Sequence, residues 1–199
     1  MVHGARSTIQ QRALQFLLIT STLLLSWLGM MVVHEFGHVA FAWSSGGKVA
    51  RVVLHPLEFS RTDMESNPHP LFVASGGALL GVTLPLIVWG LWRLLRWPGW
   101  YILQFFAGFC LVANGIYFGV VSFIPNAADP GDLMRAGSPR WPLVLFGLLT
   151  FPLGILLWNG LGPKFGLGKA AMPVNPVASL ATFGCLLILV AAEILTYAG

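Results

Sequence analysis

The sequence predicts an all-α polytopic membrane protein with about five transmembrane helices and a short membrane-surface β-hairpin after the first. Of its 199 residues, 56% are hydrophobic and only 9% are charged, whereas a soluble domain is about a quarter charged. The apolar residues fall into five long runs, and aromatic residues mark several ends of those runs. This composition also excludes a disordered chain, which needs low hydrophobicity and high charge.

The five apolar runs give the predicted spans. A crossing needs roughly 20 apolar residues, because every backbone polar group must be bonded inside the helix. The approximate bounds of the runs are 13–42, 71–95, 100–124, 141–158 and 177–198. The first run greatly exceeds the apolar core of a signal peptide, about 7–15 residues, so we expect a retained helix. We expect residues 1–199 to form a single domain in a lipid bilayer.

The connection after the first span has the composition of a short strand or hairpin. Residues 44–47 read Ser-Ser-Gly-Gly, and β-branched residues follow in the segment 49–55. A Gly-Gly turn followed by such residues favours a short strand or hairpin at the membrane surface, within the connection 44–70. The connection 125–140 is rich in turn-forming residues and holds two of the seven acids.

The charges and cysteines exclude several classes of protein. The net charge of +4 is spread over few residues without a basic run, so we expect no nucleic-acid partner. Cys110 and Cys185 both lie in apolar runs and build neither a disulfide framework nor a thiolate metal site. We therefore expect the chain to interact with a lipid bilayer and not with nucleic acid.

A chemically specific motif lies near the end of the first span. His34, Glu35 and His38 form HExxH, which places two imidazoles one helical turn apart on one face, with Cβ atoms about 6 Å apart. Two such imidazoles can bind one zinc ion at about 2.0–2.1 Å each. Glu35 can then act as general base toward water, whose pKa the ion lowers to about 7. Three ionisable groups in an apolar helix are costly unless they face a polar cavity, so we expect a catalytic site with one Zn²⁺ per chain.

The third ligand of that ion is expected after the third span. A catalytic zinc site usually has three protein ligands and one open position. Two crossings after His38 the chain returns to the same side and reaches Asp129 and Asp132. The run Asp-Pro-Gly-Asp also suits a turn followed by a helix cap, because Asp is favoured at both places. The sequence therefore offers two candidate metal ligands here, Asp129 and Asp132.

Other polar residues in or near the spans have ordinary structural interpretations. Asn114 in the third span is expected to form an interhelical hydrogen bond, and the small residues 75–77 allow close helix packing. His55 and His69 are expected to be solvated in the connection after the motif helix. Glu193 lies alone near the end of the fifth span, where it is expected to pair or to reach the membrane surface.

The two motifs together resemble the site-2 protease family of intramembrane zinc metallopeptidases. HExxH lies inside the first long hydrophobic segment, and Ala40 follows it. The second motif of that family has an Asn, then a Pro, then an Asp-Gly, with aliphatic residues four and five positions after the Asp. Here Pro125 precedes Asp129, and Leu133 and Met134 stand four and five residues after it.

The resemblance covers residues from about 25 to 135, and the last two spans match nothing specific. It implies a short sheet after the first motif helix and Asp129 as the third ligand. Pro130 separates Asp129 from Gly131, which departs from the family pattern and keeps Asp132 as the alternative ligand.

These features predict an intramembrane zinc metalloprotease that hydrolyses a peptide bond in or near a transmembrane segment of a membrane-protein or peptide substrate. As a multi-pass protein it is expected in a bacterial cell membrane or an organelle membrane. The alternative is a non-catalytic membrane scaffold or metal-binding protein on the same fold. The intact Glu35 argues against it, because a structural metal site needs no general base. A third possibility is a small transporter. Inverted repeats would favour it, and we find no convincing repeat in the sequence.

Overall fold

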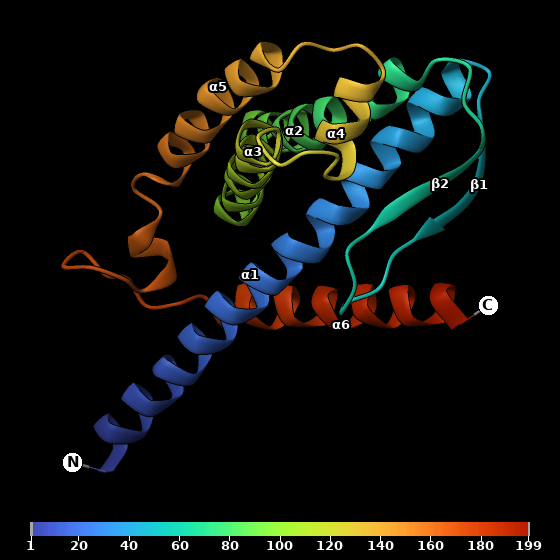
Figure 1. Cartoon of the computed structure of the whole chain (residues 1–199). Coiled ribbons are helices and arrows are strands. Elements are labelled where there is room, and N and C mark those ends of the chain that lie inside the picture. Colours follow the sequence, from blue (N-terminus) through green and yellow to red (C-terminus); the bar gives the residue numbers. More distant parts are fainter. Residues whose placement is uncertain (1, 199) are drawn as a thin grey trace.

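The computed structural model describes residues 2–198, with side chains for residues 8–197. In this part of the chain, six α-helices, one short 3-10 helix and one antiparallel hairpin follow one another. Their order is α1 (Val2–Ser44), β1 (Lys48–Val53), β2 (Arg61–Ser66), α2 (Pro70–Leu94), α3 (Trp100–Val121), α4 (Ala128–Arg135), α5 (Trp141–Trp158), η1 (Gly162–Phe165) and α6 (Pro176–Ala198). Figure 1 shows α2 to α5 gathered on one side of the long helix α1, with the hairpin along its other side.

Five of the described helices are long and apolar enough to cross a membrane, which confirms the predicted number of spans. The bounds of α2, α3, α5 and α6 agree with the predicted bounds to within about three residues. The first helix is longer than the predicted 13–42. Its 43 residues extend about 64 Å, roughly twice the thickness of the hydrocarbon core of a bilayer.

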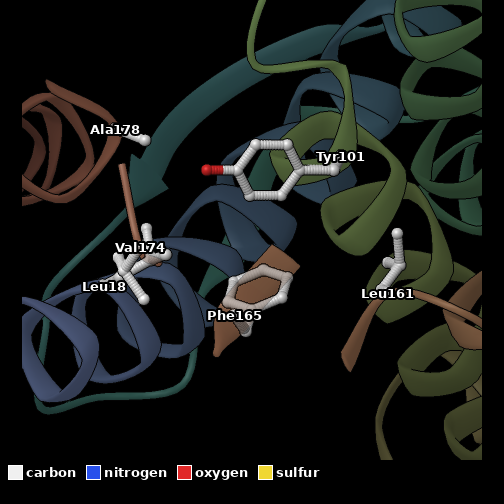
Figure 2. Packing of buried hydrophobic residues seen from close by; sticks show 6 residues of the cluster. All are labelled: Leu18, Tyr101, Leu161, Phe165, Val174 and Ala178. Atoms are coloured by element: carbon white, nitrogen blue, oxygen red, sulfur yellow. The ribbon is translucent and has the colours of Figure 1, made fainter. Parts of the chain in front are cut away.

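In the early part of α1, polar side chains form hydrogen bonds with the chain near η1. The side-chain amide of Gln15 donates to the carbonyl oxygens of Phe165 and Gly166, and Gln11 accepts a hydrogen bond from the backbone N–H of Val174. An apolar cluster lies beside these bonds (Figure 2). Its buried members come from α1, α3, η1, α6 and the adjoining loops: Leu18, Tyr101, Leu161, Phe165, Val174 and Ala178.

Glycines bring the helix backbones close together around the site. A Cβ atom on Gly37 of α1 would stand 2.3 Å from the carbonyl oxygen of Gly76 in α2. A Cβ atom on Gly147 of α5 would stand 2.6 Å from the carbonyl oxygen of Gly115 in α3. Small residues at such crossings are the usual means of close helix packing in membranes. The first turns of α2 therefore lie directly against the end of α1 that carries HExxH.

The predicted hairpin after the first helix is confirmed, and it runs back along α1 rather than across the helix end. β1 and β2 pair antiparallel, with Val53 opposite Arg61 next to the loop. In that loop the ring of Phe59 contacts the ring of Trp27 edge-on, with centroids 6.5 Å apart. Trp27 precedes Ser44, the last residue of α1, by a helical distance of about 26 Å. The hairpin therefore covers the part of α1 that carries the motif (Figure 1).

Candidate metal centre

The two motifs meet at one point in the fold. His34 and His38 lie in the last three turns of α1, and Asp129 lies in the first turn of α4. The Nε2 atom of His34 is 2.9 Å from Oδ2 of Asp129 and 3.1 Å from Nε2 of His38. The Nε2 atom of His38 is 3.4 Å from the same carboxylate oxygen. Both imidazoles are buried, so three potential ligand atoms converge away from bulk water.

The hydrogen bonds around His34 indicate which of its two ring nitrogens carries the proton. Its Nδ1 atom is 3.0 Å from Oδ1 of Asn114 in α3. The side-chain nitrogen of Asn114 donates to the carbonyl oxygen of Cys110 at 2.9 Å, which leaves Oδ1 as the accepting atom. The proton of a neutral His34 therefore sits on Nδ1, and its Nε2 carries a lone pair.

His38 has the same tautomer for a similar reason. Its Nδ1 atom is 2.9 Å from the backbone carbonyl oxygen of Val73 in α2, and a carbonyl oxygen can only accept. The Nε2 atoms of both histidines therefore direct lone pairs toward each other and toward the carboxylate of Asp129. Three such atoms within 3.4 Å of one another repel unless a proton or a metal cation lies among them. Metal-binding histidines commonly have their second nitrogen held in this way.

The spacing of the three atoms fits one divalent ion. Separations of 2.9, 3.1 and 3.4 Å place them on a circle of radius about 1.8 Å, smaller than the ligand distance of about 2.0–2.1 Å around zinc. One ion can therefore contact all three atoms. Two ligands of a tetrahedral zinc ion are about 3.3 Å apart, which is close to the observed separations. Two imidazoles and one carboxylate also form a donor set that catalytic zinc sites use.

Gly77 in α2 leaves the space that such an ion needs. A Cβ atom at this position would stand 2.5 Å from Nε2 of His38 and 2.6 Å from Nε2 of His34. Any other residue would therefore fill the space beside both ligand nitrogens. The sequence predicted close helix packing for this glycine, and its neighbours identify it as part of the candidate metal centre.

Asp129 is in the right ionic form to bind a cation. Burial acts to raise the pKa of its carboxyl, but hydrogen bonds from His34 and His38, when these imidazoles carry a proton on Nε2, outweigh burial and lower that pKa below its usual range. The residue also lies in the first turn of α4, where the helix dipole favours a negative charge. Asp129 is therefore a carboxylate at neutral pH.

Glu35 faces the same cavity as the cluster. The cavity has a volume of about 1210 Å³ and lies among α1, β2, α2, α3 and α4. Glu35 is buried, and the hydroxyl of Thr62 in β2 donates to its Oε2 atom at 2.7 Å. A carboxylate held beside a metal centre in a cavity of this size is placed to accept a proton from a water molecule.

The remaining candidates lie outside the cluster. Asp132 is half-exposed, and its carboxylate pairs with Arg135 one turn later in α4. The ring of His55 contacts the ring of Tyr197 near the end of α6 at a tilt of 48°, with centroids 4.6 Å apart. His69 is exposed just before α2. The structure thus brings together His34, His38 and Asp129 from the predicted set.

Asn114 forms the interhelical hydrogen bond that the sequence predicted, but its partner, His34, was not predicted. Two residues of the centre were missed: Tyr117 was not singled out, and Thr62 belongs to a strand of polar residues. Asn114 and Tyr117 do have one feature in the sequence that could have indicated them. They are polar groups in the third span, one turn apart, just before the segment that supplies the third ligand.

Comparison with protein-family models, with curated proteins and with solved structures finds no match to this chain. The function is therefore argued from the chemistry of the site.

Proposed function

We propose that this protein is a zinc metallopeptidase of a cell or organelle membrane that cleaves peptide bonds in or near transmembrane segments of other proteins. The observation that carries the proposal is the convergence of His34, His38 and Asp129, with Glu35 in the same cavity. This cluster lies within 15 Å or so of the end of α1, in a helix apolar enough to cross a membrane. Ionisable groups in such helices are usually functional.

In this proposal His34, His38 and Asp129 hold the ion. Zinc, when bound, supplies a Lewis acid for the substrate carbonyl and lowers the pKa of water to about 7. Glu35 accepts a proton from the attacking water as the C–O bond forms. It then transfers that proton to the amide nitrogen as the C–N bond breaks. The side-chain oxygen of Asn114 and the carbonyl oxygen of Val73 keep both imidazoles oriented through these steps, because each accepts a hydrogen bond from an Nδ1–H group.

The substrate must be extended at the bond that is cleaved, because a helix hides its carbonyl groups in hydrogen bonds. The sheet has two strands, and residues Arg61–Met64 of β2 line the cavity. The edge of β2 that is not paired with β1 is thus near the candidate site. An extended substrate that pairs with this edge would lie beside Glu35.

The test uses the full chain purified in detergent. Wild-type protein is expected to contain about one zinc ion per chain, measured by inductively coupled plasma mass spectrometry. Glu35→Gln is expected to keep that zinc and to lose cleavage of a panel of transmembrane peptides carrying a fluorophore and quencher. Glu65→Gln is the matched control, because it makes the same change at an exposed position of β2.

Each outcome separates the candidate functions. Absence of bound metal from the wild-type protein would refute the proposal that it is a metallopeptidase. If zinc binds and cleavage is the same in wild type and Glu35→Gln, the alternative of a non-catalytic metal-binding scaffold replaces it. A zinc affinity lowered about a hundredfold in Asp129→Ala, with wild-type affinity in Asp132→Ala, is expected for the proposed set of ligands.

A further inference from the structure

Asp129, the proposed third ligand, follows a segment with unfavourable backbone angles. Asn126 and Ala128 lead into α4 with φ angles of 57° and 44°, in the left-handed region. Such a conformation costs about 1–2 kcal/mol for a residue other than glycine. Ala127 at the N-cap offers no side chain to cap the helix. Local backbone preference therefore does not fix Asp129 at the metal centre, and contacts with the rest of the fold must do so.

Two consecutive residues of α3 supply these contacts. On the apolar side of α4, Leu133 packs in a buried cluster with Phe118. On the polar side, the hydroxyl of Tyr117 donates to Oδ2 of Asp129 at 3.3 Å. The same hydroxyl accepts a hydrogen bond from the backbone N–H of Asp129 at 3.4 Å. That N–H is one of the first four of the helix, which have no acceptor within it.

Tyr117 also contacts a ligand from the other motif. Its ring lies edge-on to the ring of His34, with centroids 5.9 Å apart. Tyr117 is therefore a side chain of α3 that contacts one ligand from α1 and one from α4. Its hydroxyl bonds reach both the backbone and the carboxylate of Asp129.

We propose that Tyr117 is a positioning residue that holds Asp129 in place as the third metal ligand. The inference rests on the proposed function, because it requires a metal at the site. It is distinct from packing, since a phenylalanine would keep the ring contacts with His34 and Phe118 and lose only the two hydroxyl bonds. Removing such an outer contact of a metal ligand typically lowers metal affinity by about 10–100-fold.

The test is a titration of the metal-free, full-length protein in detergent with Zn²⁺ and, separately, with Co²⁺. Tyr117→Phe is expected to raise the zinc dissociation constant about 10–100-fold and to change the absorption spectrum of bound Co²⁺. Tyr101→Phe is the matched control. It removes a buried hydroxyl from the same helix, and that hydroxyl has no hydrogen-bond partner among the described residues. Thermal unfolding in the presence of chelator checks that both variants fold.

A double-mutant cycle distinguishes positioning from a general structural effect. If Tyr117 acts through Asp129, Tyr117→Phe causes no further loss of affinity in an Asp129→Ala background. Wild-type zinc affinity in Tyr117→Phe would overturn this inference and leave the proposed function standing. Equal, additive losses in both backgrounds would also overturn it. A wild-type protein that binds no metal would overturn the proposed function and the inference together.

Discussion

Gly77→Ala is the sharpest steric test of the candidate metal centre. Its Cβ atom would stand 2.5 Å from Nε2 of His38 and 2.6 Å from Nε2 of His34, whereas ordinary contacts begin at 3.4 Å. The overlaps are therefore about 0.9 and 0.8 Å (3.4 − 2.5 and 3.4 − 2.6), too large for a shift that keeps the packing. The imidazoles cannot turn aside without breaking their bonds to Asn114 and Val73.

Two energies compete in this variant when no metal is present. Overpacking of this kind costs about 1–3 kcal/mol. Alanine is a better helix former than glycine by about 1 kcal/mol. We therefore expect Gly77→Ala to lose at most about 2 kcal/mol of stability in chelator. The loss of zinc affinity is expected to be larger, at least about a hundredfold or 2.8 kcal/mol, because the methyl group occupies space beside two ligand atoms.

The assay is competition for zinc with a coloured chelator in detergent, together with thermal unfolding with and without zinc. Gly90→Ala is the control, since it makes the same change in α2 where no described atom lies within 4 Å of the added Cβ. Gly90→Ala is expected to bind zinc like wild type. Wild-type zinc affinity in Gly77→Ala would refute the placement of the ion between the two histidines.

Three further variants test the surroundings of the ligands. Asn114→Leu leaves Nδ1–H of His34 without an acceptor and is expected to weaken zinc binding about 10–100-fold in the same competition assay. Asp132→Ala removes a surface ion pair worth at most about 1 kcal/mol and is expected to change zinc affinity no more than about twofold. A hundredfold loss would instead make Asp132 a ligand. Thr62→Val removes the hydroxyl that holds Glu35, so cleavage is expected to fall about tenfold at unchanged zinc affinity. Unchanged cleavage in Thr62→Val would contradict that role.

The spans could be predicted from the sequence because hydrophobicity alone decides them. The extra turns at the start of α1 could not be, because residues 2–12 are mostly polar, and the backbone N–H that Gln11 accepts from belongs to Val174, 163 residues later. The hairpin was predicted, but the position of its second strand, β2, was not located. Its residues Arg61–Ser66 are mostly polar, and they pair with β1 without the β-branched pattern that marks a strand.

In the candidate site, too, the local features could be predicted from the sequence, and the contacts between distant residues could not. The spacing of His34 and His38 is local, and a helix of any origin would place them on one face. The choice between Asp129 and Asp132 is not local. Two residues that are three positions apart in a helix differ by only about 60° in direction and about 4.5 Å in rise. From the sequence alone, either acid could therefore occupy the ligand position. The contacts of α4 with Tyr117 and Phe118 decide which acid reaches the histidines.

The long sequence separations within the centre affect how the protein is made. His34 contacts Asn114 and Asp129, which follow it by 80 and 95 residues. At a synthesis rate of about 5–20 residues per second, those 95 residues take about 5–19 s. Until then His34 lacks one or both of these partners, and each unsatisfied group in hydrocarbon costs several kcal/mol. Because α1 precedes α3 and α4 along the chain, its buried His34 reaches its stable environment only after both have been made.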